Sequence, residues 1–406
     1  MRVLIADKFS SQGRQTLEIL AHKVVYRPEL TSAELPAALA ELSADILVVR
    51  STRVTSECLG ACDSLSVVIR AGAGVNTIDL TTASRRGIFV ANCPGKNAIA
   101  VAELTMGLVL SLDRRIVDAT AELRAGTWNK KRFGKSRGIF GQRLGLIGFG
   151  MIAREVATRA QAFGIEIQAY SRRGIAADVA EKYDVSVAPD IDTILRQNDI
   201  VSLHVPYNDN THHMIGREQL ALMQPGALII NTSRGGIIDD AALYDAVREG
   251  RVRAGLDVCE GEPSSSHGDY DNQLLQLQGV YATPHIGAST SQAEAAIGEE
   301  VVRIVRAYIL DGVVPNTVNI VQDRVAHYNL VVRHLDRVGV LAGVLEALRE
   351  QRVNVQDMQN IVFARGEAAC ATLSLEHEPS AELLTHLRGQ ESILAVGLRR
   401  AASQGS

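Results

Sequence analysis

The chain has 406 residues, of which 46% are hydrophobic and 22% are charged, and its net charge is −4. This length and apolar content predict two to four domains with hydrophobic cores, and they exclude a disordered chain or a small disulfide-stapled fold. Because no global basic field exists, we expect no nucleic-acid partner and no membrane partner. The N-terminus lacks the apolar core of a signal peptide, and the longest apolar stretch, 98–112, is shorter than the roughly 20 residues of a membrane span, so we predict a cytoplasmic protein.

Nine short runs rich in Val, Ile and Leu alternate with helical patterns, which is typical of parallel βαβ units. The runs are apolar throughout, as expected for strands that are covered on both faces. We predict these strands at residues 3–6, 46–49, 67–70, 88–91, 143–147, 165–169, 200–204, 228–231 and 254–258. Between the fourth and fifth of them we predict one long helix over 97–124, which would connect two α/β lobes.

The composition changes at residues 312–319, where a Pro and two Asn interrupt the periodicity, and we place a linker at 313–325. The residues from 326 to 406 then predict a strand, a helix, two strands, a second helix and a last strand, at 330–334, 339–352, 355–364, 368–375, 380–388 and 393–398. This βαββαβ order is typical of a ferredoxin-like module. The sequence therefore predicts an α/β protein with two doubly wound parallel-sheet lobes and an appended C-terminal α+β domain.

The five cysteines are scattered and odd in number, without a CxxC pair and without a histidine at zinc-finger spacing. This usage predicts reduced, mostly buried thiols and no metal site. The residues are Cys58, Cys62, Cys93, Cys259 and Cys370.

A glycine motif lies between the predicted strand 143–147 and the helix that follows it, where Gly148, Gly150 and Ala153 fit the pattern GxGxxA. The first glycine allows a tight turn and the second lets the backbone approach a pyrophosphate, whose charge the helix N-terminus favours. We therefore predict a dinucleotide site that consists of Gly148, Gly150, Met151 and Ile152.

The choice of dinucleotide depends on the end of the next predicted strand. The acidic residue expected about 20 residues after such a motif, for the ribose hydroxyls, is absent. Ser171, Arg172 and Arg173 occupy that position instead. An arginine accommodates a 2′-phosphate that a carboxylate would repel, so the pattern favours NADP, or the use of both NAD and NADP. Alternatively, the two arginines are part of a solvated loop.

Three further stretches place polar residues at predicted strand ends: NTSRGG at 231–236, GLDVCEGEP at 255–263 and TPHIGAST at 283–290. Each alone has a structural explanation, as a capping turn, a strand end or a Pro-bounded loop. Together with the glycine motif, in this order and spacing, they resemble the D-2-hydroxyacid dehydrogenase family over residues 1–312. The resemblance implies two Rossmann-like lobes, one binding the substrate (1–96 and 283–312) and one binding the dinucleotide (97–282).

For the chemistry, the resemblance implies that His285 is the acid/base, that Glu262 is its carboxylate partner and that Arg234 binds the substrate carboxylate. These residue types suit the oxidation of a 2-hydroxy acid, which requires a base for the hydroxyl proton, a cation for the carboxylate and an acceptor for the hydride. The family's default cofactor is NAD. The resemblance also places five residues beside the cofactor: His204, Pro206, Thr232, Ser233 and Asp257.

For the substrate, the resemblance implies that Ala73 and Gly74 hold the carboxylate, that Arg50 and Arg70 bind a phosphate group and that Asn97 is a polar contact. Two arginines at one site suit a phosphate dianion, whereas an unphosphorylated acid would leave a buried cation unpaired. Alternatively, both arginines are surface or loop residues.

Within the family, we therefore expect 3-phosphoglycerate as the substrate. An NADPH-preferring reduction of glyoxylate or hydroxypyruvate is the alternative, and a non-catalytic dinucleotide-sensing scaffold is a second alternative. The resemblance further implies a homodimer or a homotetramer, in which the basic loop of Lys130, Lys131 and Arg132 reaches toward the partner subunit.

The segment 326–406 resembles an ACT regulatory domain, because HLDRVGVL at 334–341 is similar to the common HxNxPGVL. The resemblance implies an amino-acid effector at His334, Asp336 and Asn354. Asp336 replaces an Asn and Val338 replaces a Pro of that pattern. An Asp accepts from an amino group but cannot donate to a carboxylate, so the departures predict weaker serine binding, another effector or no regulation.

Overall fold

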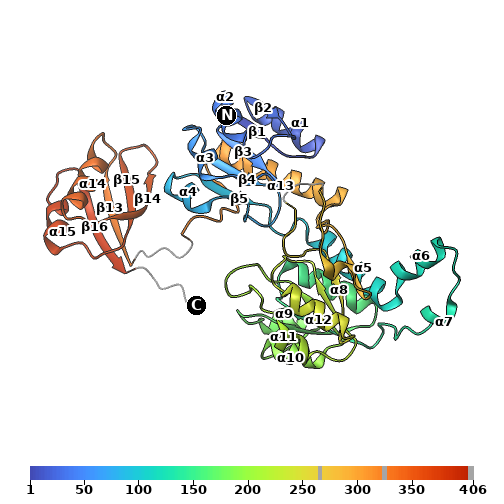
Figure 1. Ribbon diagram of the computed structural model, residues 1–406. Helices are drawn as coiled ribbons and strands as arrows, with labels where there is room; N and C mark the ends of the chain where they lie inside the picture. The colour runs from blue at the N-terminus through green and yellow to red at the C-terminus, as the bar shows by residue number, and fades with distance from the viewer. Residues whose placement is uncertain (264–267, 322–326, 401–406) are drawn as a thin grey trace. The chain divides into compact units, whose positions relative to one another are not determined.

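The computed structural model describes residues 1–263, 268–321 and 327–400. It divides into two compact units, residues 1–319 and residues 320–406. The first unit contains two parallel sheets, and the second contains one antiparallel sheet (Figure 1). Within the described ranges, no helix is both long enough and apolar enough to cross a membrane.

The first lobe is a five-stranded parallel sheet in the order β2-β1-β3-β4-β5. Its two central strands, at 46–49 and 67–70, are apolar and buried on both faces, which explains why they lack an alternating pattern. Its strands are β1 (Arg2–Ile5), β2 (Lys23–Tyr26), β3 (Ile46–Val49), β4 (Val67–Arg70) and β5 (Phe89–Asn92). Its helices are α1 (Ser11–Leu20), α2 (Leu35–Leu42), α3 (Ser56–Gly60), α4 (Leu80–Arg85) and α13 (Ser291–Asp311), which returns from the second lobe and packs against α1.

The second lobe is a seven-stranded parallel sheet in the order β12-β11-β10-β9-β6-β7-β8, with one hydrophobic cluster on each face. Its strands are β6 (Arg143–Ile147), β7 (Glu166–Tyr170), β8 (Ser186–Val187), β9 (Ile200–Leu203), β10 (Ala227–Asn231), β11 (Val252–Leu256) and β12 (Val280–Ala282). Its helices are α5 (Ala98–Arg114), α6 (Ile116–Arg124), α7 (Lys130–Phe133), α8 (Met151–Ala162), α9 (Ala177–Lys182), α10 (Ile191–Gln197), α11 (Arg217–Leu222), α12 (Asp240–Arg248) and the 3₁₀ turn Gln273–Gln276. The two parallel sheets confirm the predicted α/β class.

The single helix predicted over 97–124 is wrong in one respect, because the structure divides it into α5 and α6. Arg115, at φ 52°, adopts the left-handed conformation between them. Ten residues of α5 are buried against the second lobe, whereas α6 buries none. The chain changes direction where the buried face ends, and no Gly or Pro at 115 marks that point in the sequence. The short strands β2, β8 and β12 were also not among the predicted ones.

The second unit has the predicted βαββαβ order, in a four-stranded sheet with the order β14-β15-β13-β16. Its elements are β13 (Tyr328–Leu335), α14 (Val340–Glu350), β14 (Val355–Val362), β15 (Ala368–Leu375), α15 (Ala381–Arg388) and β16 (Ile393–Arg400). Every second residue of β15 is buried, in one core with Val344, Leu348 and Leu387 of the two helices. This alternation is expected for a sheet that is covered on one face.

Part of the segment predicted as a linker lies along β5. Thr317 pairs antiparallel with Ala91, and Asn319 Oδ1 accepts a hydrogen bond of 2.8 Å from Val90 N. Asn316 Nδ2 donates to Asn92 O at 3.2 Å and to Glu300 Oε1 at 2.7 Å. Residues 314–319 therefore belong to the first unit, whereas residues 322–326 lie outside the described ranges.

Candidate active site

The candidate catalytic and cofactor-binding side chains follow the carboxyl ends of parallel strands in the second lobe. Gly148 follows β6, His204 follows β9, Arg234 follows β10 and Asp257 follows β11. β6, β9, β10 and β11 are direct neighbours in the sheet, in register. The carboxyl ends of neighbouring parallel strands share one edge, which is where ligands bind in open α/β sheets. The fold therefore gathers residues that are spread over more than a hundred positions.

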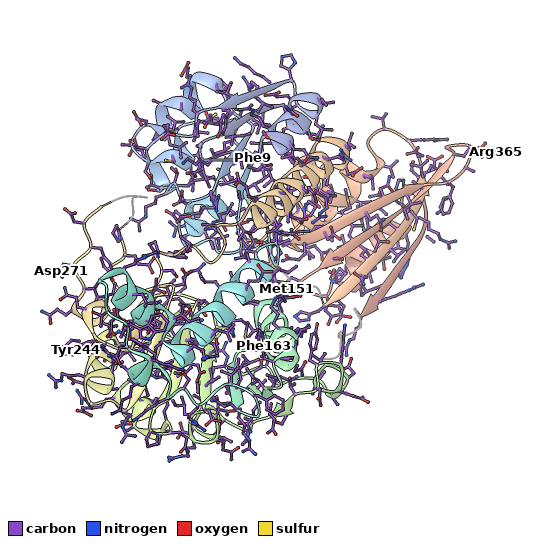
Figure 2. All side chains as sticks on the ribbon, turned by 90° about the vertical axis from the view of Figure 1, so that its right-hand side faces the viewer. Phe9, Met151, Phe163, Tyr244, Asp271 and Arg365 are labelled. Carbon is purple, nitrogen blue, oxygen red and sulfur yellow. The ribbon has the colours of Figure 1, made fainter. Side chains whose placement is uncertain are left out.

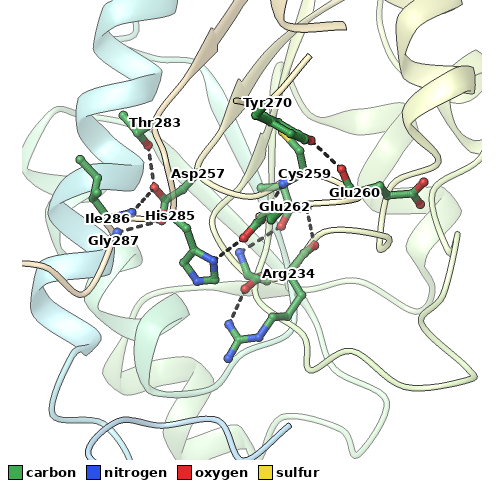
Figure 3. Close-up of polar contacts among 12 residues, drawn as sticks. Arg234, Asp257, Cys259, Glu260, Glu262, Tyr270, Thr283, His285, Ile286 and Gly287 are labelled. Carbon is green, nitrogen blue, oxygen red and sulfur yellow. Dashed lines mark hydrogen bonds and ion pairs between the residues drawn. The ribbon is translucent and has the colours of Figure 1, made fainter. Parts of the chain in front are cut away.

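His285 and Glu262 form a hydrogen-bonded pair at this edge (Figure 3). Nδ1 of His285 lies 2.7 Å from Oε2 of Glu262, whose Oε1 accepts a hydrogen bond of 2.8 Å from Cys259 N. A carboxylate only accepts, so Nδ1 carries the proton and Nε2 of the neutral ring is the basic nitrogen. The His285 side chain is 50% exposed. This arrangement leaves an oriented base that a substrate hydroxyl can reach.

Asp257 holds the loop that carries His285 (Figure 3). Its Oδ1 accepts from Thr283 Oγ1 at 2.6 Å and from Ile286 N at 2.8 Å, and its Oδ2 accepts from Gly287 N at 2.8 Å. Its carbonyl accepts from His285 N at 2.9 Å, and His285 has a left-handed φ of 52°. A left-handed conformation at a non-glycine residue persists only where the surroundings hold it, and Asp257 provides that hold. Its predicted contact with a cofactor stays a prediction.

Arg234 lies where the two lobes meet. Its Nη1 donates to Ser233 O at 2.6 Å, and its Nη2 lies so close to Gly74 of the first lobe that a Cβ there would be 2.5 Å away. Burial lowers the pKa of Arg234, and the nearby charge of Glu262 opposes that shift. The guanidinium therefore lies between the histidine pair and the loop at 72–74.

Two neighbours of Arg234 that we predicted beside the cofactor have partners inside the protein. The Thr232 hydroxyl lies 3.0 Å from that of Thr105 on α5, and Ser233 Oγ donates to Leu203 O at 2.5 Å.

Arg70 ends β4 and lies near two other guanidinium groups. The pKa of Arg70 is lowered to about 10, mainly because the side chain is buried and also because of the charges of Arg234 and Arg50. Its Nε atom is enclosed and has no hydrogen-bond partner, and the same holds for Oδ1 of Asn97 at the start of α5. Unpartnered buried polar atoms are uncommon in folded proteins, so both atoms are candidates for a polar contact with a bound ligand.

Two residues that the sequence analysis missed position the first-lobe loops. Both oxygens of the Asp7 carboxylate accept hydrogen bonds from the segment 50–52, including one of 2.6 Å from Arg50 N. Asn92 Nδ2 donates to Ala73 O at 2.6 Å, which fixes the loop that contains Ala73 and Gly74. An Asp directly after a first strand is the only signal that the sequence offers for either residue.

The glycine motif forms a cradle at the N-terminus of α8, whose two ends are marked by Met151 and Phe163 in Figure 2. Gly148 has a φ of +91°, and a Cβ there would overlap with the carbonyl of His204. A Cβ at Gly150 would meet open space, and no side chain caps α8, which begins with Met151 and Ile152. Free amide groups facing open space fit the diphosphate of a dinucleotide. Ser171, Arg172 and Arg173 follow β7 at the same edge, and both arginines are exposed.

His204 lies beside this cradle as a neutral imidazole. Burial lowers its pKa to about 4, and its Nε2 lies 2.9 Å from Ser202 Oγ. Its Nδ1 is enclosed without a partner. The carbonyl of Pro206 accepts from Thr211 Oγ1 at 2.7 Å.

Of the three predicted effector residues, His334 and Asn354 have different surroundings in the described part of the second unit. His334 is buried inside the second unit, with Nε2 3.2 Å from Asn360 Oδ1 and Nδ1 2.8 Å from Leu335 O. Asn354 instead lines a hollow of about 410 Å³ beside α14, which contains neither His334 nor Asp336. Arg349 and Arg352 line the same hollow.

Comparison with known proteins assigns the family. Residues 106–287 match the D-isomer specific 2-hydroxyacid dehydrogenase, NAD binding domain. The D-3-phosphoglycerate dehydrogenase of Methanocaldococcus jannaschii is 42% identical over 330 residues, which are 80% of this chain and 61% of that protein, so the chain spans less than two thirds of that relative. The hydroxypyruvate reductase of Thermotoga maritima is 43% identical over 303 residues, 74% of this chain and 96% of that protein.

Solved structures agree with this assignment. An acyclic imino acid reductase in complex with NADPH and D-Arg has a TM-score of 0.70 at 27% identity, covering 78% of this chain and all of that chain. The D-lactate dehydrogenase of Aquifex aeolicus, complexed with NAD and lactic acid, has a TM-score of 0.65 at 26% identity, covering 79% of this chain and all of that chain. The strand-end residues, the glycine cradle and these likenesses together show that the chain belongs to the D-isomer specific 2-hydroxyacid dehydrogenases, a family of oxidoreductases that bind a nicotinamide cofactor.

Proposed function

We propose that the chain is a D-3-phosphoglycerate dehydrogenase, which transfers a hydride reversibly between 3-phosphoglycerate and a nicotinamide cofactor. The product of the oxidation is 3-phosphohydroxypyruvate, and the reaction opens the phosphorylated route to serine. The observation that carries the proposal is Arg70, a largely buried cation with an unpartnered Nε and two further guanidinium groups nearby.

The charge at this position supports a substrate with two anionic groups. The nearby charges of Arg234 and Arg50 lower the pKa of Arg70, so the three cations repel one another in the free protein. A phosphate monoester carries about −1.5 to −2 charges near neutral pH, and a carboxylate adds one more. A phosphorylated hydroxy acid would therefore match three guanidinium groups, whereas glycolate or glycerate would leave cations unpaired.

The proton transfer follows from the histidine pair. During oxidation, His285 Nε2 takes the proton of the substrate hydroxyl, and the Glu262 carboxylate at Nδ1 stabilises the imidazolium that forms. Arg234 binds the substrate carboxylate and sets the carbon that is oxidised beside the histidine. A dinucleotide whose diphosphate is held by the cradle would supply its nicotinamide ring as the hydride acceptor.

The cofactor choice rests on the end of β7. No carboxylate follows Tyr170, and the exposed Arg172 and Arg173 suit a 2′-phosphate, so we propose NADP or the use of both cofactors. This feature also favours the second candidate, an NADPH-dependent hydroxypyruvate or glyoxylate reductase, to which the 43% identity with the Thermotoga maritima enzyme lends support. A non-catalytic scaffold is disfavoured because Arg234, Glu262 and His285 are all present.

The test measures the reduction of 3-phosphohydroxypyruvate, hydroxypyruvate and glyoxylate, each with NADH and with NADPH. We expect the highest kcat/KM for the phosphorylated acid, and a preference for an unphosphorylated acid would favour the reductase. In Arg172→Ala the NADPH rate should fall relative to the NADH rate, and Arg137→Ala, at an exposed arginine of the same lobe, is the control. An inert wild type that still binds the dinucleotide would favour the scaffold.

For the assembly, we propose a homodimer through the second lobe, with pairing of the C-terminal domains as a route to a homotetramer. α6 buries no residue, and Ile116, Val117, Leu123 and Trp128 are exposed on it and beside it. A second copy of the chain would cover this apolar arm, and Lys130, Lys131 and Arg132 follow it directly. Light scattering after size-exclusion chromatography tests the assembly, and a monomer at micromolar concentration would contradict it.

We also propose that residues 326–406 form an ACT-like domain that binds an amino acid, with Asn354 at the site. The hollow beside Asn354 and its two arginines support an amino-acid carboxylate as the bound group. Isothermal titration with serine, glycine and alanine tests this, and the absence of heat with all three would contradict it.

A further inference from the structure

We infer that His212, His213 and Glu260 form a binding site for one transition-metal cation, with Zn²⁺ as the reference ion. Each residue offers one ligand atom, and these atoms all lie within 4.8 Å of one another. The histidines belong to the loop after β9, and Glu260 belongs to the turn after β11. In Figure 3 the Glu260 side chain points away from the pair of Glu262 and His285, so the cluster is separate from the acid/base pair.

The ligand set fits zinc. Two imidazole nitrogens and one carboxylate oxygen, with a fourth position open, form a common zinc environment, whereas Ca²⁺ and Mg²⁺ prefer oxygen ligands alone. His213 Nε2 and Glu260 Oε1 are already hydrogen-bonded to each other. A cation between these two atoms would replace the shared proton, which is released to solvent.

The geometry requires two small adjustments. Tetrahedral ligands about 2.1 Å from a zinc ion lie about 3.4 Å from one another. The hydrogen-bonded atoms of His213 and Glu260 must therefore move apart to admit the ion, and the nitrogen of His212, which lies within 4.8 Å of both, must come to a similar distance from them. The His212 ring has room to move because it is exposed. It stacks on His213 with centroids 3.9 Å apart and meets Tyr207 edge-on at 6.0 Å.

The loop that presents the histidines is held from several sides. Asn208 N donates to Thr211 Oγ1 at 2.8 Å, and Asn210 N donates to Asn208 Oδ1 at 3.0 Å. His213 has a left-handed φ of 48°, and its N–H donates to Gly236 O at 2.8 Å. The hydrogen bond to Gly236 O therefore holds the backbone of His213 in this conformation.

Glu260 is fixed equally well. Its N–H donates to Asp240 Oδ2 at 3.2 Å, and its carbonyl accepts from Tyr270 OH at 2.5 Å. The bound cation would therefore join the loop after β9 to the turn after β11, across Gly235 and Gly236 of the loop between them.

The experiment uses the full-length protein after treatment with a chelator and dialysis. Zn²⁺ is titrated in competition with a chromophoric chelator, with Mg²⁺ as the comparison ion. We expect one equivalent of Zn²⁺ per chain and no competition from Mg²⁺. His213→Asn, Glu260→Gln and His212→Ala each remove one ligand atom and should each weaken binding by about tenfold or more, because even the loss of a residue that only supports a ligand costs about 10–100-fold.

The variants are chosen to preserve the fold. Asn tolerates the left-handed conformation that residue 213 adopts, and Gln keeps the shape of Glu260. His377→Ala removes an exposed histidine of the second unit and should bind Zn²⁺ like the wild type. The inference is overturned if the wild type binds no stoichiometric Zn²⁺ below millimolar concentration, or if the folded ligand variants bind it as tightly as the wild type does.

Discussion

The two lobes differ in whether the charged groups of the candidate site have hydrogen-bond partners within the protein. On the second-lobe side, both oxygens of Glu262 and both of Asp257 accept hydrogen bonds from the protein itself. On the first-lobe side, Arg70 keeps an enclosed Nε without a partner and lies near two like charges.

This difference corresponds to the different roles of a general base and a substrate-binding cation. A general base must be oriented before the substrate arrives, so its partners are built into the fold. A binding cation must exchange its partner in every turnover, so it has no fixed partner in the fold. We expect this to lower the free energy of unfolding of the free protein. Glu300 shows that this chain does pair buried charge elsewhere: Arg303, Asn316 and Lys96 lower the pKa of its carboxyl to about 2.

The largest expected effect concerns His285, which is already hydrogen-bonded to Glu262. His285→Ala should lower kcat by about 10²–10⁴-fold, the usual contribution of a general acid/base, with little change in cofactor affinity. Steady-state rates and a cofactor titration measure both quantities. His377→Ala is the control, and near-normal turnover in His285→Ala would remove His285 from its proposed role.

Replacing Arg70 on the first-lobe side should lower activity and raise the free energy of unfolding. In Arg70→Met, kcat/KM for the phosphorylated acid should fall by roughly 10²-fold or more, because the partner charge of the substrate is then buried unpaired. The free protein should become more stable by on the order of 1 kcal/mol, since an unpaired buried cation is replaced by an apolar side chain. Urea unfolding without substrate measures this, and a destabilised variant would show that Arg70 is satisfied in the free protein.

Replacing Glu300, whose charge is paired, should instead lower the free energy of unfolding. Its folded pKa of about 2 lies below its ordinary 4.5, so its contribution is complete above pH 4.5 and is lost as the pH falls toward 2. Glu300→Gln should therefore destabilise the protein by about 2–3 kcal/mol at pH 7 and by much less at pH 3. Urea unfolding at both pH values tests this against Glu299→Gln, an exposed neighbour on α13. A pH-independent difference would contradict it.

The smallest effect should come from the segment that leads to the second unit. Asn316 has a left-handed φ of 58°, so Asn316→Gly removes its side-chain hydrogen bonds without adding backbone strain. The loss should be about 1 kcal/mol of stability, with kcat unchanged and a small rise in KM, because Asn92 links this segment to the loop at Ala73. An unchanged KM together with unchanged stability would show that the contact is dispensable.

Features that depend on residues close together along the chain were predictable from the sequence. The glycine motif, the strand-end stretches around Arg234, Glu262 and His285, and the βαββαβ order of the last domain each depend on local periodicity or spacing. The α/β class and the family, inferred from those patterns, are confirmed. Parallel strands make this possible, because a residue just after a buried strand must lie at the same sheet edge as its counterparts after neighbouring strands.

Features that join distant residues were decided only by the tertiary structure. Asp7 meets its partners 43 to 45 residues away, and Asn316 meets Asn92 across 224 residues. Glu260 lies 47 residues from His213, so short histidine and cysteine spacings could not indicate that these two side chains meet. The break at Arg115 belongs to the same class, because it marks where the buried face of α5 ends. Contacts of this kind depend on which surfaces pack together, and side-chain pairing across a folded core leaves no periodic trace in a single sequence.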